Sequence, residues 1–316
     1  MNEQATGGEG GAAAPARFSR DRVLAEMYEG IWAIRPEALS VLLRQVLALG
    51  DLSGRAPAGI GAQEGAEAVA KRAGKAPGAI AVLPVHGVIS QRAGFFSLLF
   101  GGTSTEWLGA QMRALVADPE VGAIVLDVDS PGGSVFGVPE LAEEIRALRG
   151  RKPIVAVADS IAASGAYWIA AQADQVVVSP SGEVGSIGVF ALHADLSGML
   201  AKEGVKATFV QFGENKTLGN PFEPLSERAK EEIQRRVDEY GRQFVRAVSR
   251  GRGVTEKEVM DRFGQGLMFG AVDAVRLGLA DRVATLGEVL AELWAPASGK
   301  GRKAALAREV QRAALG

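Results

Sequence analysis

The sequence predicts an α/β domain built on a mainly parallel sheet. Short apolar runs rich in β-branched residues recur along the middle of the chain, and turns and segments with helical spacing of apolar residues separate them. Because these runs show no alternation of polar and apolar residues, they are typical of strands buried on both faces by helices. The runs occupy residues 80–89, 123–128, 154–157 and 176–178.

The helices expected between and after these strands have recognisable ends. Ser104 is suited to cap a helix that passes through Met112 and stops before Asp118-Pro119, and another helix begins directly after Ser164. Beyond the last run, a strand is expected at 207–212. The remaining expected helices are 139–148, 196–203, a long one from Ser226 to about Arg250, 255–263 and 272–279.

Composition shifts divide the chain into five segments. Residues 1–18 are predicted to be a disordered tail, 51–78 a Gly/Ala-rich linker, and 291–316 a basic tail that is helical or disordered. Between the first two, residues 19–50 form a predicted helical extension, and residues 79–290 form the main domain. In the extension Pro36 separates two amphipathic helices, whose apolar positions at helical spacing include Val23, Met27, Ile31, Leu39 and Val46.

The bulk composition excludes several classes of protein. The 316 residues carry a net charge of −2, so nothing favours nucleic acid as a partner. There are no cysteines and two histidines, which argues against disulfides, thiolate nucleophiles and a metal site built from histidine. No apolar run reaches the roughly 18 residues that span a bilayer, and we expect a cytoplasmic protein without a membrane anchor.

Loops at the ends of the apolar strands carry the candidate chemistry. Ser164 lies where a strand passes into a helix, between the small residues Ala163 and Gly165, which allow close approach of a substrate. A serine nucleophile needs a base and backbone donors for the developing oxyanion. Gly132-Gly133 and Gly165 are candidate donors. Lys216 is a candidate base, a role in which the pKa of a lysine must fall from about 10.4 towards 7 or 8.

Four ordered motifs resemble the signature set of the signal peptide peptidase A family of serine proteases. They are DSPGGSV at 129–135, SIAASGAYWIA at 160–170, GSIGV at 185–189 and NKTLGNP at 215–221. The resemblance covers about residues 79–285. It implies a crotonase-like fold, shared with the Clp proteases, and a serine endopeptidase that works through an acyl-enzyme.

The resemblance also assigns roles to particular residues. No cofactor and no metal ion is implied. A ring-like homo-oligomer is implied, in which the serine and lysine of one site can come from adjacent protomers. In this reading Ser164 is the nucleophile, Lys216 the general base, Ser186 the residue that orients the lysine, and Gly133 and Gly165 the oxyanion donors, with Gly132 as a neighbouring possibility.

Two features favour the phage branch of this family, the capsid or prohead maturation proteases. They are the segment 219–226 and the helical N-terminal extension. That branch cleaves scaffold and portal proteins inside an assembling head, so the location would be the host cytoplasm or the capsid. The alternative within the family is a cytoplasmic housekeeping peptidase.

Other readings of the same residues remain open. A Ser-His-Asp triad could use His193 with Asp195 or Asp174, but it would leave the Lys216 loop unexplained. His193 and His86 otherwise read as hydrogen-bonded polar residues. An acyl-CoA hydratase or isomerase would share the backbone donors, yet no pair of catalytic glutamates stands out. A non-catalytic assembly scaffold would use the N-terminal helices and the apolar loop 95–100.

Overall fold

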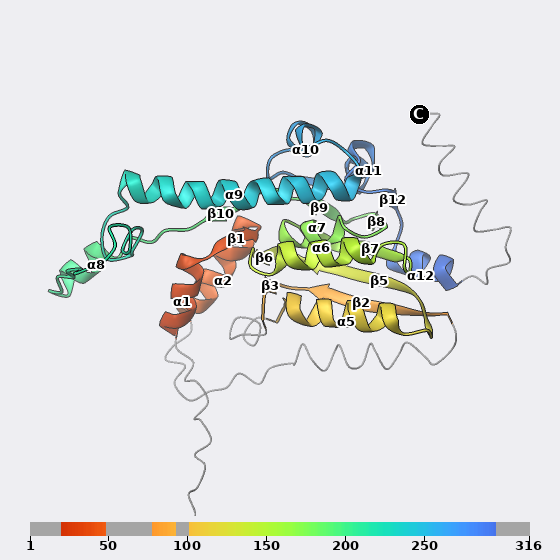
Figure 1. Cartoon of the computed structure of the whole chain (residues 1–316), viewed down its shortest axis with the longest axis horizontal. Helices are drawn as coiled ribbons and strands as arrows, with labels where there is room; N and C mark the ends of the chain where they lie inside the picture. The colour runs from red at the N-terminus through yellow and green to blue at the C-terminus, as the bar shows by residue number, and fades with distance from the viewer. Residues whose placement is uncertain (1–19, 49–77, 93–100, 295–316) are drawn as a thin grey trace, which may run out of the picture.

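The computed structural model describes residues 20–48, 78–92 and 101–294. The predicted N-terminal tail, most of the linker, the apolar loop 95–100 and most of the C-terminal tail lie outside these residues. Within them the chain forms two β-sheets (Figure 1).

The larger sheet is mainly parallel, which confirms the predicted α/β class. Its path is β11 (Met268–Gly270), β9 (Glu183–Gly185), β7 (Ile154–Ala163), β5 (Val121–Ser130) and β2 (Ala79–His86). Beside β7 lies β8 (Gln175–Val178), which in turn pairs with β12 (Arg282–Val283). Among these pairings only β11 with β9 is antiparallel. Strand β7 forks, because residues 155–158 pair with β8 whereas 161–163 pair with β9.

Helices cover both faces of the larger sheet, and this is why its central strands are rich in apolar residues. Ile124, Leu126 and Val128 of β5 belong to the main core with α5 (Thr105–Ala117), α6 (Val138–Leu148), α7 (Gly165–Ala170) and α9 (Glu227–Arg252). Val125 points to the other face, where α12 (Leu286–Trp294) packs. The period of two along β5 therefore separates two cores.

The smaller sheet includes a strand that the sequence analysis missed. Its order is β10 (Phe190–Ala191), β1 (Ile31–Ile34), β6 (Gly132–Ser134), β3 (Ile89–Ser90) and β4 (Thr103–Ser104). The prediction that Ile31 belongs to a helix is wrong, because α1 (Arg20–Glu29) ends before it and α2 (Pro36–Ala48) begins after it. Arg35 precedes a proline, a position biased away from helix, and the run Ile31–Ile34 finds strand partners on both sides.

An arm built around α8 (Ser197–Lys202) projects from the body of the molecule (Figure 1). The strand predicted at 207–212 is wrong, since these residues form no strand in the described chain, and Val210 and Phe212 are fully exposed. An apolar run becomes a strand only where a partner edge is available. The predicted helices after the arm are confirmed as α9, α10 (Glu256–Arg262) and α11 (Ala271–Leu277).

A close contact between α7 and α9 gives the first testable prediction. A Cβ atom on Gly251 of α9 would lie 2.2 Å from the carbonyl oxygen of Ala171. Gly251→Ala is therefore expected to lower the free energy of unfolding by about 1–3 kcal/mol. Gly241→Ala, in the same helix, meets only a side-chain contact at 3.8 Å and is expected to raise it by about 0.5–1 kcal/mol. Urea unfolding checks both, and equal stability of the two variants would contradict the tight contact.

Candidate active site

Ser164 occupies a strained turn at the junction of β7 and α7. Its backbone has φ 54° and ψ −119°, a conformation that residues other than glycine rarely adopt and that costs on the order of 1–3 kcal/mol. The residue is completely buried. Its N–H donates to the carbonyl oxygen of Gly185 at 2.8 Å, and its hydroxyl donates to the carbonyl oxygen of Gly188 at 3.3 Å. The fold therefore holds one specific serine in an unfavourable conformation at the end of a central strand.

Ser186 directly follows β9, the strand that pairs with the end of β7 before Ser164. Ala163 of β7 and Gly185 of β9 are register partners in a parallel pair, so the residues that follow them are adjacent. Ser186 also has a positive φ, of 55°, and its N–H donates to the carbonyl oxygen of Leu267 at 2.7 Å. The structure thus places two buried serines with unusual backbones together at one edge of the sheet.

Gly132 and Gly133 allow an approach of backbones that no side chain would permit. A Cβ atom on Gly132 would lie 2.1 Å from the carbonyl oxygen of Ala33 and 3.0 Å from the amide nitrogen of Gly165. A Cβ atom on Gly133 would lie 1.9 Å from the carbonyl oxygen of Ile89. Both positions therefore require glycine, and β6 is fixed against β1, β3 and the start of α7.

Gly133 and Gly165 both lie close to the carbonyl oxygen of Ala33. A Cβ atom on Gly165 would lie 3.1 Å from the carbonyl oxygen of Ala33 and 3.6 Å from the amide nitrogen of Gly133. Gly165 is the first residue of α7, so its N–H has no acceptor within the helix. Backbone N–H groups of two glycines close to a buried serine are the kind of donors that acyl transfer needs.

The N–H of Gly132 has a different partner, one that the sequence analysis did not single out. It donates to the hydroxyl oxygen of Ser130 at 3.1 Å, and the Ser130 hydroxyl donates to the carbonyl oxygen of Gly87 at 2.6 Å. Ser130 is completely buried. Its position directly before Pro131 and the double glycine was the available signal, because serine side chains often bond the backbone two residues along.

The helix that follows Ser164 is held at several points. Trp168 stacks on Phe244 of α9 with ring centroids 4.4 Å apart. The Tyr167 hydroxyl donates to the carbonyl oxygen of Leu279 at 2.8 Å, and burial raises the pKa of this hydroxyl above its ordinary value. These contacts oppose any relaxation of the strained turn at Ser164.

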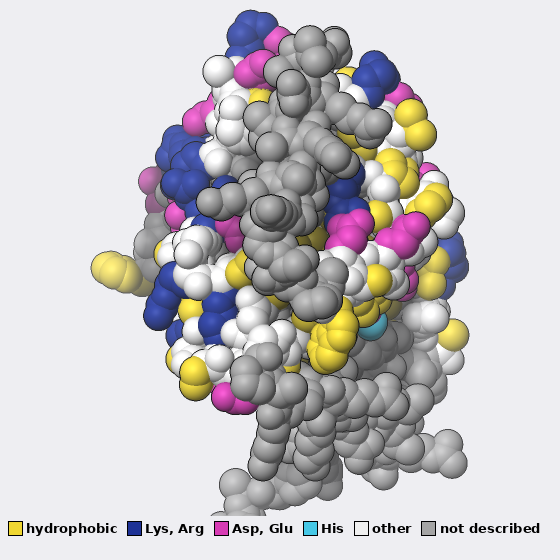
Figure 2. All heavy atoms as spheres, turned by 90° about the vertical axis from the view of Figure 1, so that its right-hand side faces the viewer, with side chains coloured by type: hydrophobic (Ala, Val, Ile, Leu, Met, Phe, Trp, Pro, Cys, Tyr) yellow, Lys and Arg dark blue, Asp and Glu magenta, His cyan; other side chains and the backbone are white. Residues whose placement is uncertain are grey.

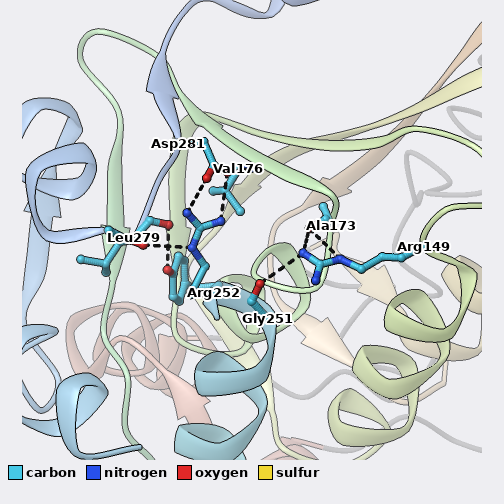
Figure 3. A network of polar contacts seen from close by, with 9 residues as sticks. Arg149, Ala173, Val176, Gly251, Arg252, Leu279 and Asp281 are labelled. Carbon is cyan, nitrogen blue, oxygen red and sulfur yellow. Dashed lines mark hydrogen bonds and ion pairs between the residues drawn. The ribbon is translucent and has the colours of Figure 1, made fainter. Parts of the chain in front are cut away.

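A network of polar contacts, built around Arg252 and Arg149, joins the end of α9 to β8 and to the residues after α7 (Figure 3). Arg252 of α9 donates to both carboxylate oxygens of Asp281, at 2.7 and 3.0 Å. Asp281 also accepts the N–H of Val176 in β8 at 2.7 Å. Arg149 donates to the carbonyl oxygens of Ala173 and Gly251. Helix α9 is thereby joined to the sheet and to the segment after α7.

In the described chain no hydrogen bond joins Lys216 to Ser164. Lys216 is exposed, whereas Ser164 is buried, and the described Ser164 hydroxyl donates to Gly188 instead. The segment between α8 and α9, which carries Lys216, lies on the opposite side of β1 and β10 from α7 (Figure 1). Lys216 lines a cavity of about 320 Å³ together with Ile31, His193 and Arg236.

The alternative Ser-His-Asp triad is not assembled in the described chain. The ring of His193 lies 3.2 Å from the carbonyl oxygen of Asn220. Asp174 accepts the N–H of Ile154 at 2.9 Å, and Asp195 accepts hydrogen bonds from Ser197, which lower the pKa of the Asp195 carboxyl. Each carboxylate therefore has a local structural partner.

His86, the last residue of β2, is a hydrogen-bonded polar residue, as its position in the sequence predicted. Its Nε2 lies 3.0 Å from a carboxylate oxygen of Asp127, and this hydrogen bond raises the pKa of the imidazole. Among the residues that the structure describes, no group of three or more His, Cys, Asp or Glu side chains is placed to hold a metal ion.

Two observations concern the outside of the molecule. None of the helices in residues 20–48 and 101–294 is long and apolar enough to cross a membrane. On the face shown in Figure 2, the described basic and acidic side chains are both present and are mixed with hydrophobic ones.

The chain is similar to one family of proteins and to several individual proteins. Residues 146–298 match the family model of Peptidase family S49. The chain is 32% identical over 204 residues to capsid assembly protease C of Escherichia phage lambda, covering 65% of this chain and 46% of that protein. It is 32% identical over 211 residues to the head-tail preconnector protein GP5 of an enterobacteria phage, covering 67% and 42%. The chain thus spans less than half the length of these two phage relatives.

A further relative is matched over more of its length. The chain is 30% identical over 188 residues to the Synechocystis sp. protein named "Putative protease slr0021", covering 59% of this chain and 67% of that protein. Among solved structures, a point mutant of ClpP1 from Listeria monocytogenes has a TM-score of 0.41 and 12% identity, over 66% of this chain and 94% of that one.

The buried Ser130 hydroxyl gives the second prediction. Ser130→Ala leaves the carbonyl of Gly87 and the N–H of Gly132 without this partner, so we expect a loss of about 1–3 kcal/mol in unfolding free energy. Ser134→Ala, which removes an exposed hydrogen bond to the N–H of Phe136, is expected to change it by less than about 0.5 kcal/mol. Thermal and urea unfolding measure both, and a neutral Ser130→Ala would rule out this role.

Proposed function

Because the chain belongs to Peptidase family S49, we propose that it is a serine endopeptidase with Ser164 as its nucleophile. One observation carries the proposal. The strained, buried Ser164 directly precedes Gly165, and both Gly165 and Gly133 lie close to one backbone carbonyl oxygen, that of Ala33. Such preorganised donors stabilise the oxyanion of acyl transfer.

The chemistry follows from these positions. The Ser164 oxygen attacks the carbonyl carbon of a peptide bond, and its proton passes to the base. The Gly133 and Gly165 amides donate to the oxyanion of the tetrahedral intermediate. The C–N bond then breaks as the base returns the proton to the leaving amine, which leaves an ester on Ser164. A water molecule, deprotonated by the same base, hydrolyses that ester.

Lys216 is the proposed base, supplied by a neighbouring copy of the chain. The arm that carries it exposes several large apolar side chains, among them Val205, Val210 and Phe212. Exposed apolar residues gathered on a projecting arm suit a subunit contact. Burial in such a contact favours the neutral amine that a lysine base requires. Ser186, beside Ser164, is the proposed residue that orients this amine.

The biological role proposed is maturation of a phage capsid, with scaffold or portal proteins as substrates. The support is the similarity to two phage proteins named for capsid assembly and for the head-tail connection. Action would then take place in the host cytoplasm or in the assembling capsid. The similarity to "Putative protease slr0021", which covers more of that relative's length, favours the second candidate, a cytoplasmic housekeeping peptidase.

The shared site can be tested by mixing two inactive variants. Ser164→Ala and Lys216→Met are each expected to lose hydrolysis of a fluorogenic peptide, because one lacks the nucleophile and the other the base. When the two chains are co-expressed in equal amounts, about a quarter of the sites in a random homo-oligomer pair an intact serine with an intact neighbouring lysine. Activity near that fraction of the wild-type value is therefore expected.

His193→Ala is the matched control and is expected to retain activity within about twofold, since the His193 ring lies by the Asn220 carbonyl oxygen whereas the Ser164 hydroxyl donates to Gly188 in the described chain. No recovery on mixing would contradict a site shared between subunits. Loss of activity in His193→Ala with retention in Lys216→Met would support the triad instead. A wild-type oligomer that hydrolyses no peptide or casein would support the non-catalytic scaffold.

A further inference from the structure

A cavity of about 320 Å³ lies where the first half of α9 meets β1, β10 and the turn that carries Lys216. These two strands lie directly below that half of α9 in Figure 1. Two of the lining residues, Lys216 and Arg236, are cations, and His193 adds an imidazole. No Asp or Glu of the described chain lines the cavity. The charge of its lining is therefore positive.

The wall of the cavity that carries Lys216 is a turn held by its own hydrogen bonds. The N–H of Lys216 donates to the carbonyl oxygen of Gly213 at 3.0 Å, and the N–H of Asn220 donates to that of Thr217 at 3.2 Å. The side-chain amide of Asn220 also donates to the Thr217 carbonyl oxygen, at 2.8 Å. The ring of His193 lies 3.2 Å from the Asn220 carbonyl oxygen, which ties the turn to the residues after β10.

The two cations of the lining have no carboxylate partner, although carboxylates are close to them in the sequence. Glu214, two residues before the lysine, is paired with Arg228 at 2.6 Å. Glu232, one turn before Arg236, accepts two hydrogen bonds from Arg235, at 2.6 and 3.0 Å, and interacts with Arg236 only through its charge. Within the described residues, neither cation of the lining makes an ion pair or a side-chain hydrogen bond.

Two unpaired cations that line one cavity suit an oxyanion as ligand. Phosphate and carboxylate groups bind through charge-assisted hydrogen bonds, to which arginine contributes a planar fork of donors and lysine a compact charge. The cavity has the volume of roughly ten water molecules, which leaves room for a small oxyanion together with water.

We propose that this cavity is a regulatory anion site, in which a phosphate or carboxylate group binds between Lys216 and Arg236 and inhibits the enzyme. The inhibition rests on the proposed function, in which Lys216 is the base. An anion beside an amine favours the charged form of that amine, and a charged lysine cannot accept the Ser164 proton. Inorganic phosphate and the terminal carboxylate of a released peptide share the required chemistry, so either can be the source of the anion.

Isothermal titration of inorganic phosphate into the full-length Ser164→Ala chain tests the site without any turnover. We expect saturable binding that the added substitution Arg236→Gln weakens about tenfold or more, because a charge-assisted contact is lost. Arg242→Gln is the matched control, since it removes the same charge from the same helix but Arg242 does not line the cavity. It is expected to change the affinity by less than about twofold.

Thermal unfolding checks that each of these variants is folded. Equal phosphate affinity in the folded Arg236→Gln and Arg242→Gln variants, or no saturable binding to the parent chain, would overturn the anion site.

Hydrolysis of a fluorogenic peptide by the wild-type chain tests the inhibition. Saturating phosphate is expected to lower the rate at least about fivefold relative to sodium chloride of equal ionic strength, because it holds the base in its charged form. Arg236→Gln is expected to lose most of this inhibition, measured against its own rate without phosphate. A short peptide with a free terminal carboxylate, compared with its amide, shows whether a cleavage product acts in the same way.

The outcomes separate this inference from the proposed function. Phosphate binding that leaves the rate unchanged, or equal inhibition by chloride, would overturn the regulation and leave the peptidase standing. Inhibition that depends on Arg236, by phosphate or by the carboxylate peptide, would support the regulation and identify the source of the anion. Phosphate binding that depends on Arg236 in a chain that hydrolyses no peptide would support the anion site, while the proposed function and the inhibition would fail.

Discussion

Contact between three backbone segments around the Ala33 carbonyl oxygen is the constraint on which the rest of the structure depends. Strand β6 approaches β1 through Gly132 at a distance that excludes any side chain, and the start of α7 closes the third side. The same crowding brings Gly133 and Gly165 close together beside Ser164, so packing and the proposed chemistry have a common cause.

Strain at this point is held in place by the interior around it. Ser164 and Ser186 both adopt positive φ, and conformations of this kind persist only where neighbouring structure over-determines them. Here the neighbours are the stack of Trp168 on Phe244, the buried Tyr167 hydroxyl and the Arg252–Asp281 pair. The energy that orders α7 against α9 thus maintains the geometry at the end of β7.

The sequence was sufficient to predict features that depend on local patterns. The apolar runs of β2, β5, β7 and β8 and the capped helices follow from period and composition, and Ser164 was placed correctly between a strand and a helix. Features that depend on a partner were missed. Ile31 fits a helical period as well as a strand, and only pairing with β6 and β10 decides the outcome. Residues 207–212 have strand-like composition but no strand partner in the described chain.

In the candidate site, too, features that depend on local sequence could be predicted and features that depend on a partner could not. The turns at Gly132, Ser164 and Ser186 could be located from sequence, because each follows a strand of one parallel sheet and such ends meet at one edge. The place of Lys216 could not, since the proposed contact lies between chains. Nothing in the pattern of residues 31–34 indicated that this segment would lie against Gly133 and Gly165.

The central claim is that Ser164, and not the similarly strained Ser186, is the nucleophile. Reaction of the oligomer with a fluorophosphonate probe, followed by peptide mapping of the adduct, measures this most directly. The account predicts a single adduct on the Ser164 hydroxyl, absent in Ser164→Ala. An adduct on Ser186, or no adduct on a folded oligomer, would contradict it.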